Sequence, residues 1–305
     1  MRYYTDEKNL QIIMALLKAF NIRKIITSPG STNHTLVASM QNDEWFEMYS
    51  SVDERSAAYM ACGLCEESGE PVVITCTEAT ASRNYMPGLT EAYYRKLPVL
   101  AITTTHGADK VGQHFAQVID HSVLPNDIAL YHTYIPSCHS TKDEKLTILK
   151  VNEALLELSH RGGGPVYLNV ESVASRDYST RELPAVRKLE RFVSWDKLPE
   201  LPEGKIGIFV GSHKKWSKSE TTAIERFCEV NNAVIFCDHT SGYNGTYHIS
   251  YSLVGSQDTY QSDLSKLRLL IHIGEVSGDY FSMRLGGSAQ ELSLIHISEP
   301  TRLRR

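Results

Sequence analysis

The sequence lacks any apolar run near the roughly 20 residues that a membrane-spanning helix requires. Its N-terminus, MRYYTDEKNLQ, turns polar and acidic where a signal peptide needs an apolar segment. Its Lys and Arg residues are scattered, and a net charge of -5 gives no basic patch of the kind that binds nucleic acid. These absences predict a cytoplasmic protein that binds neither membrane nor nucleic acid.

Motifs for metals, redox chemistry and nucleotides are also scarce. Cys62 and Cys65 form one C-x-x-C pair, but it lies within the helical pattern AAYMACGLC and no second pair follows at zinc spacing. Gly211 after KIGIFV stands alone, without a P-loop or a dinucleotide fingerprint. We therefore expect the cysteines to be small core residues. They are Cys62, Cys65, Cys76, Cys138, Cys228 and Cys237.

What the sequence does contain is an alternation of short β-rich runs and longer helical patterns. With 305 residues, 42% hydrophobic and 22% charged, the chain is long enough for about two domains. Such an alternation predicts an α/β fold, a doubly wound parallel sheet with helices on both faces. The expected strands are KIIT (24–27), FEMYSSV (46–52), PVVITCT (71–77), PVLAITT (98–104) and PVYLNV (165–170). The expected helices span 6–20, run from Ser31 or Thr32 towards Met40, begin at Glu54 and near Ala81, and span about 143–160.

Composition divides the chain further. Residues 1–178 form the first predicted domain, and residues 179–204 are charged and proline-containing without a sustained period, which indicates a linker. Residues 205–292 are predicted to form part of a second α/β domain, with strands at KIGIFVG, NAVIFCD and LRLLIHIG. The end, LSLIHISEPTRLRR, resembles translated adaptor sequence, so residues 293–305 are predicted to be non-native; an ordinary terminal strand and basic tail is the alternative.

Glu54 is the strongest candidate for chemistry. It follows a predicted strand and opens a helix, and the carboxyl ends of parallel strands line the crevice where open α/β sheets bind ligands. A glutamate favoured at a helix start by the helix dipole is the simpler interpretation.

The surrounding motifs favour the first interpretation. SPGS (28–31), VDERSAA (52–58), VVITCT (72–77), Asn84 and Pro87 together resemble the pyrimidine-binding domain of thiamine diphosphate-dependent enzymes. Within them the resemblance is strongest to the 2-succinyl-5-enolpyruvyl-6-hydroxy-3-cyclohexene-1-carboxylate synthases of menaquinone biosynthesis, and it covers roughly the first 170 residues. It implies the thiamine diphosphate-binding fold.

The same resemblance implies roles for individual residues. Glu54 would hydrogen-bond the aminopyrimidine of the cofactor and help to activate its thiazolium carbon. Ser31, Thr32 and Gln117 would face the substrate, and Asp120 would orient the loop GQHFAQVIDH. Three nearby histidines, His106, His114 and His121, are either acid-base candidates or surface residues. The remaining residues implied to contact the cofactor are Pro29, Gly30, Thr77, Glu78 and Asn84.

Two positions depart from the synthase pattern. Thr32 stands where the synthases carry an arginine that grips a substrate carboxylate, which weakens the case for their specificity. Glu78 replaces a serine or glycine, placing a second carboxylate that either interacts with Glu54 or points to solvent.

In this family, Mg²⁺ and the cofactor's diphosphate are held by a separate C-terminal domain with a Gly-Asp-Gly motif. The nearest string here, Ser277 to Tyr280, lacks the second glycine, so we predict no metal ligands in this chain. The resemblance thus implies a fragment of a 2-oxo-acid decarboxylase or carboligase, inactive alone, that forms a homodimer or homotetramer through the pyrimidine domain. Alternatives are one subunit of a split phosphonopyruvate or sulfopyruvate type decarboxylase, with a separate diphosphate-binding subunit, and a non-catalytic binding module.

Overall fold

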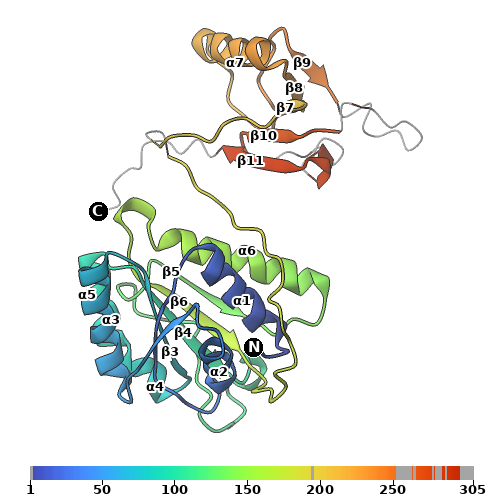
Figure 1. Ribbon diagram of the computed structural model, residues 1–305. Coiled ribbons are helices and arrows are strands. Elements are labelled where there is room, and N and C mark those ends of the chain that lie inside the picture. Colours follow the sequence, from blue (N-terminus) through green and yellow to red (C-terminus); the bar gives the residue numbers. More distant parts are fainter. Residues whose placement is uncertain are drawn as a thin grey trace. The chain divides into compact units, whose positions relative to one another are not determined.

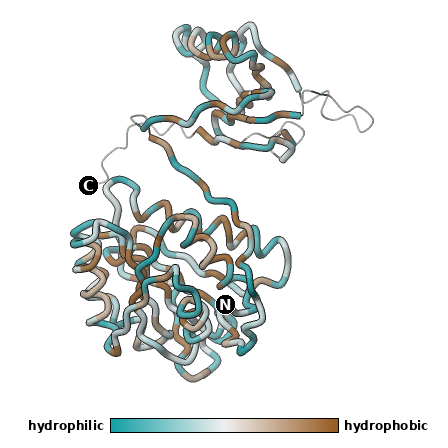
Figure 2. Tube along the Cα trace, in the orientation of Figure 1, coloured by the Kyte–Doolittle hydropathy of each residue, from teal (hydrophilic) through white to brown (hydrophobic). Residues whose placement is uncertain are grey.

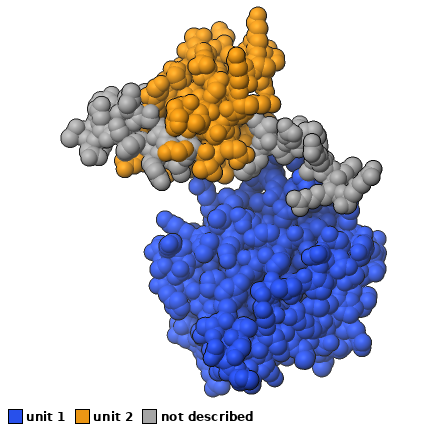
Figure 3. Space-filling view, turned by 180° about the vertical axis from the view of Figure 1, so that it is seen from behind, with its two compact units in different colours: residues 1–195 blue, residues 196–305 orange. Residues whose placement is uncertain are grey.

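The computed structural model (Figure 1) describes residues 3–193, 196–251, 263, 266–276, 278, 284–285 and 287–295. The chain divides into two compact units, residues 1–195 and 196–305 (Figure 3). The division falls within the segment predicted to be the linker, 179–204. Each unit is built on its own parallel sheet, and the first carries every candidate site residue.

The first unit contains a six-stranded sheet in the order β2-β1-β3-β4-β6-β5, with all neighbours parallel. The chain leaves β1 outwards to β2 and then returns to β3 on the other side of β1. This reversal creates a topological switch point between β1 and β3, where open α/β sheets bind ligands. The strands are β1 (Lys24–Thr27), β2 (Glu47–Ser50), β3 (Val72–Thr77), β4 (Val99–Thr105), β5 (Tyr131–Ile135) and β6 (Val166–Glu171).

Helices cover both faces of this sheet, as the doubly wound prediction requires. One core joins the sheet to α1 (Lys8–Ala19), α2 (His34–Gln41) and α6 (Thr141–Glu157). The other joins it to α3 (Glu54–Ser68), α4 (Thr80–Asn84) and α5 (Met86–Arg95). Figure 2 shows the hydrophobic strands enclosed between these layers. Short 3-10 turns occur at Ala108–Lys110 and His160–Gly162.

The sequence predictions hold for this unit with three differences. Strand β5 lies in a stretch that the sequence pattern left irregular. Helix α2 begins at His34 after Asn33, rather than being capped by Ser31 or Thr32. The helix expected from Ala81 is two helices, α4 and α5, separated at the fully buried Tyr85. Burying that large ring fixes the chain at the junction.

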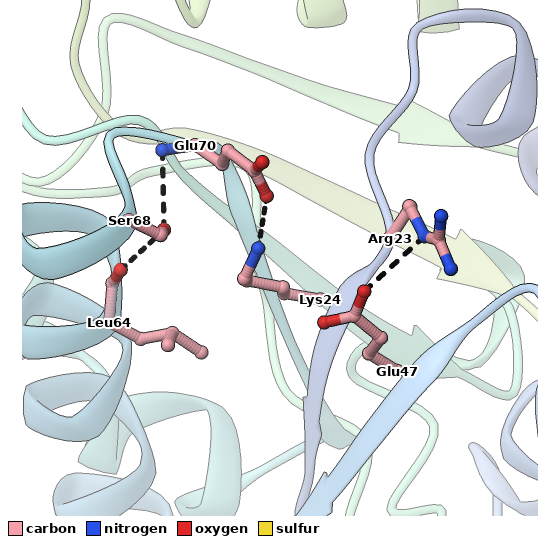
Figure 4. Close-up of polar contacts among 6 residues, drawn as sticks. All are labelled: Arg23, Lys24, Glu47, Leu64, Ser68 and Glu70. Carbon is pink, nitrogen blue, oxygen red and sulfur yellow. Dashed lines mark hydrogen bonds and ion pairs between the residues drawn. The ribbon is translucent and has the colours of Figure 1, made fainter.

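Polar contacts tie the sheet to α3 at the end remote from the carboxyl ends of the strands (Figure 4). Lys24 on β1 pairs with Glu70 beyond the end of α3, and Arg23 Nε lies 3.4 Å from Glu47 Oε1 on β2. The Glu70 backbone N–H donates to Ser68 Oγ at 3.3 Å. Exposed pairs of this kind stabilise little individually, so the orientation of α3 depends mainly on its buried face.

The segment after β6 is held against α1 by one buried carboxylate. Glu7 accepts hydrogen bonds from Ser172 Oγ at 3.2 Å, the Val173 backbone N–H at 3.1 Å and the Ser175 backbone N–H at 2.9 Å. A buried carboxylate needs such partners to offset its lost hydration. The chain leaving the sheet therefore follows a defined path over the first unit.

The second unit contains a five-stranded parallel sheet in the order β11-β10-β7-β8-β9. The elements are β7 (Ile206–Val210), α7 (Lys218–Asn231), β8 (Val234–Cys237), β9 (His248–Ser250), β10 (Leu269–Ile273) and β11 (Glu291–Ile295). Three of the strands match the predicted runs. β11 includes residues 293–295 of the predicted tail; whether that tail is native stays a prediction.

Candidate functional site

The SPGS turn forms the first wall of the switch point. Ser28 continues the sheet, its backbone N–H donating to the Thr75 carbonyl at 2.9 Å, and Pro29 and Ser31 are exposed. Asn33 holds the turn closed, because its Oδ1 accepts from the Gly30 N–H at 2.7 Å and its Nδ2 donates to the Ser28 carbonyl at 3.2 Å. A short, braced turn is thereby presented at the carboxyl end of β1.

Gly30 is required by the close approach of β3. A Cβ at this position would lie 2.7 Å from Thr77 Cγ2, closer than real Cβ contacts. The glycine thus keeps the turn directly beside the end of β3. Both predicted cofactor contacts, Gly30 and Thr77, are brought together here.

Thr32 lies beneath the SPGS turn. It is fully buried, and its hydroxyl lies 2.5 Å from Thr77 Oγ1 and 2.7 Å from Thr104 Oγ1, and donates to the Thr104 carbonyl at 3.0 Å. The predicted contact of Thr32 with substrate stays a prediction, and the structure places this side chain in the interior. Its hydroxyl joins the carboxyl ends of β3 and β4 beneath the turn.

Glu54 opens α3 beside the switch point and is half-buried. Asp53, not Glu54, caps the helix, accepting from the Ser56 backbone N–H at 3.0 Å. Glu54 Oε2 accepts from Asn84 Nδ2 at 3.2 Å, so two predicted cofactor residues from separate helices meet. Asp53 is thus the N-cap, and Glu54 is the acidic residue of the first turn, a position that the helix dipole also favours.

Below this pair lies a buried polar layer that the sequence did not reveal. The Tyr85 hydroxyl is beside Ser28 and Cys76, and burial raises the pKa of Tyr85 well above its usual value, with Cys76 and Glu54 adding to the shift. Burial likewise raises the pKa of the Cys76 thiol, with Glu54 adding to it. Both groups are therefore neutral near the Glu54 carboxylate, and the Tyr85 hydroxyl is buried without a hydrogen-bond partner among the described residues.

Glu78 is buried, which excludes the interpretation that it points to solvent. Only 2% exposed, it accepts a short hydrogen bond from Thr105 Oγ1 and another from the His106 backbone N–H at 3.3 Å. It thus braces the ends of β3 and β4.

The next residue, Ala79, has φ 61° and ψ −131°, a backbone conformation that strongly favours glycine.

The loop of residues 106–130 carries the predicted substrate residue Gln117, which is exposed with a positive φ of 63°. His114 is exposed and His106 is half-buried, its ring 5.6 Å from the Phe115 ring. The surface interpretation therefore holds for His114. Asp120 Oδ1 accepts from the Ser122 N–H at 2.8 Å, two residues further along the loop.

His121 is buried, contrary to the surface interpretation. Its Nδ1 lies 3.3 Å from the Tyr167 hydroxyl on β6, and Nε2 is buried without a hydrogen-bond partner among the described residues. Burial lowers the pKa of His121 to about 4; nearby Arg83 lowers it further, whereas Asp120 opposes the shift. Arg83 also donates to the Asp120 carbonyl at 2.7 Å, which anchors this end of the loop.

Neither disulfides nor metal-binding clusters occur among the described residues. All six cysteines are free, five of them buried and Cys138 half-buried, in line with their predicted core role. Across the part of the chain that the structure describes, no group of three or more His, Cys, Asp or Glu side chains is arranged to hold a metal ion. Ser277, Asp279 and Tyr280 of the string noted above lie outside the described residues. Among the helices described, none is both long and apolar enough to span a bilayer.

Sequence reasoning missed Asn33 and Tyr85, and only Asn33 had a signal in the sequence. Asn33 follows the Pro-Gly turn by three residues, a spacing at which an asparagine side chain can close a turn. Tyr85 adjoins Asn84 within a helical pattern, where an aromatic residue would be assigned to the core without reference to the site.

Comparison with known proteins agrees with this geometry. Residues 8–124 match the family described as thiamine pyrophosphate enzyme, N-terminal TPP binding domain. The predicted resemblance is confirmed. The matched region contains β1, α3, β3 and the first part of the 106–130 loop, and hence every candidate site residue.

Similar curated proteins are 2-succinyl-5-enolpyruvyl-6-hydroxy-3-cyclohexene-1-carboxylate synthases. That of Phocaeicola vulgatus is 36% identical over 190 residues, 62% of this chain and 34% of the relative. That of Porphyromonas gingivalis is 29% identical over 250 residues, 78% of this chain and 43% of the relative. The matched region therefore spans between about a third and two fifths of the length of these synthases.

Replacing Ala79 by glycine should stabilise the first unit by about 1 kcal/mol, because glycine adopts this backbone conformation without strain. Urea unfolding followed by circular dichroism measures the change. Ala81→Gly, within α4, is the matched control and should destabilise the unit by about 1 kcal/mol. Equal destabilisation by both substitutions would show that Ala79 is not strained.

Acidification should destabilise the first unit through His121. Its folded pKa of about 4 lies below the unfolded value of about 6.5, so the unfolded state gains the proton first and stability falls as the pH drops from about 6.5 to about 4. Between pH 7.5 and 5 the loss attributable to this group is about 2 kcal/mol.

Urea unfolding of the wild type and His121→Gln at these two pH values measures the difference. The variant should lose less stability on acidification than the wild type. An identical pH dependence for the two proteins would contradict the buried neutral imidazole.

Proposed function

We propose that this chain supplies the pyrimidine-binding half of a thiamine diphosphate-dependent enzyme that decarboxylates a 2-oxo acid or transfers the resulting fragment to an acceptor, in the cytoplasm. The observation that carries the proposal is Glu54, held by Asn84 at the switch point of a domain that matches the family over residues 8–124. The named activity of the relatives supports the reaction class.

The residues present fit the pyrimidine of the cofactor. Glu54 Oε1 receives no hydrogen bond from the described residues, which leaves a carboxylate oxygen to accept from the ring. Pro29 and Gly30 form a partly exposed turn at the carboxyl end of β1, with Thr77 directly beside Gly30. When bound, the cofactor supplies the carbanion chemistry, and this chain binds and orients its pyrimidine.

The acceptor substrate is proposed to differ in charge from the acceptor of the synthases, which carry an arginine at the position of Thr32, next to the SPGS turn. Thr32 is buried and neutral, and the nearby Glu78 is a carboxylate bonded to neutral donors. Neither can form a bidentate pair with a substrate carboxylate. The support is strongest for a menaquinone-synthase-like architecture with altered acceptor recognition.

The second half of the site, with Mg²⁺ and the diphosphate ligands, is proposed to come from residues outside these 305. The relatives are two to three times longer than the region they share with this chain, which supports such a division. Either a further segment of the same protein or a separate subunit could supply these ligands.

The purified chain should bind thiamine diphosphate weakly and release no CO₂ from 2-oxo acids. Isothermal titration with cofactor and Mg²⁺ measures the binding, and Glu54→Gln should weaken it about tenfold, because a charged hydrogen bond is replaced by a neutral one. Glu67→Gln, exposed on the same helix, is the control and should bind as the wild type does. Binding unaffected by Glu54→Gln would contradict the assignment, and sustained turnover by the chain alone would contradict the missing half.

We also propose that the chain self-associates through α3. Gly63 is exposed in the middle of this helix, and a Cβ there would meet nothing within 4 Å. An interior glycine costs the helix about 1 kcal/mol relative to alanine without benefit to this chain's own packing. Val52, Tyr59 and Met60 are exposed nearby, at 92%, 48% and 46%. A second copy packing closely on this surface accounts for both features.

Met60→Glu should shift the chain from dimer to monomer, because it places a charge in the proposed interface. Sedimentation velocity across a concentration series measures the shift. Leu149→Glu, at an apolar residue 46% exposed on α6, is the matched control and should leave the dimer intact. A wild-type chain that stays monomeric at high micromolar concentration would contradict the interface.

A further inference from the structure

We propose that Asn84 is the positioning residue of Glu54, and that the close crossing of α3 and α5 at Ala58 and Gly88 sets this pair in place. The importance of Glu54 rests on the function proposed above. The claim about Asn84 and the crossing concerns this chain alone and is tested without cofactor.

The crossing is unusually close. A Cβ on Gly88 would lie 2.5 Å from Ala58 Cβ, 3.0 Å from its carbonyl carbon and 3.2 Å from its Cα. Only glycine therefore permits α5 to approach α3 as it does, and the two helices pack side by side along one face of the sheet (Figure 1). Ala57, Ala58 and Ala61 on α3 are all nearly fully buried in this core.

The functional pair lies beside this contact. Glu54 precedes Ala58 by four residues, one turn of α3, and Asn84 precedes Gly88 by four residues. The side chains of Glu54 and Asn84 therefore meet beside the backbone contact of Ala58 and Gly88. Asn84 ends α4, which joins α5 at Tyr85. Moving α5 away from α3 at the crossing would therefore also separate Asn84 Nδ2 from Glu54 Oε2, now 3.2 Å apart.

The backbone of Asn84 is held in place by the residue that follows it. Asn84 ends α4, and the following residue, Tyr85, is fully buried between α4 and α5. An exposed asparagine is ordinarily free to rotate, but here the adjoining ring holds its backbone. The side chain that donates to Glu54 Oε2 therefore starts from a backbone that is held in place.

The two oxygens of the Glu54 carboxylate therefore differ in their hydrogen bonding. Oε2 is engaged by Asn84, whereas Oε1 takes no hydrogen bond from any residue that the structure describes. Asn84 therefore restrains the rotamer of Glu54 and leaves one oxygen directed for a donor from outside the chain. A conformationally free glutamate would have to be ordered on binding.

The test is the side-chain amide resonance of Asn84 in two-dimensional ¹⁵N–¹H spectra of the cofactor-free chain, assigned by its loss in Asn84→Ala. Glu54→Ala should move the resonance towards the position of a free asparagine amide. Gly88→Ala should move it in the same direction, because the added Cβ forces the helices apart. The double variant Ala58→Gly with Gly88→Ala removes one Cβ from the contact and should return the resonance most of the way to the wild-type position.

Thr80→Ala, at an exposed residue starting α4, is the control and should leave the resonance unmoved. An Asn84 resonance indifferent to Glu54→Ala would overturn the hydrogen bond. One that responds to Glu54→Ala but not to Gly88→Ala, with both variants folded by circular dichroism, would overturn the role of the crossing. Because no cofactor is present, failure of thiamine diphosphate binding leaves these outcomes unchanged.

Discussion

The parallel alignment of β1, β3 and β4 is the constraint on which the rest of this protein depends. Because all three strands run the same way, their carboxyl ends meet at one edge of the sheet. The chain goes from β1 to β2 on one side and then to β3 on the other side, so the loops after β1 and β3 diverge and leave a crevice between them. Each loop that leaves this edge carries a polar side chain towards the others. The sheet topology thus determines where the candidate site lies, and the individual residues determine what it can bind.

Different polar groups occupy the two faces of the sheet at this edge. Thr32, Thr77 and Thr104 join their hydroxyls on the face covered by α1, α2 and α6. On the opposite face Tyr85 and Cys76 lie beneath Glu54, and burial keeps both neutral. No ion pair of Glu54 is formed with the residues that the structure describes, so this carboxylate above a neutral, buried layer is suited to accept a hydrogen bond from a ligand.

The sequence predicted the fold, and the position of Glu54 at the start of a helix, because those signals are local. Periodic apolar runs located most strands, and a glutamate directly after a strand is visible without a structure. The environment of Thr32 was not predictable, because its burial arises from contacts with Thr77 and Thr104, 45 and 72 residues away in the chain. The alternatives for Glu78 and His121 stayed open for the same reason: their burial depends on tertiary partners, Thr105 for Glu78 and Tyr167 for His121, that the sequence pattern does not reveal. Strand β5 was missed because its residues YHTYI, partly exposed at the sheet edge, form no continuous apolar run.

The central claim is that the carboxyl ends of β1 and β3, together with Glu54, form a binding site for an aminopyrimidine. The most direct measurement is a backbone amide NMR titration with the pyrimidine half of the cofactor, 4-amino-5-hydroxymethyl-2-methylpyrimidine, which needs neither metal nor diphosphate ligands. The account predicts shifts concentrated at residues 28–31, 53–55 and 77–84, which disappear in Glu54→Gln. Shifts elsewhere in the first unit, or none at millimolar ligand, would contradict it.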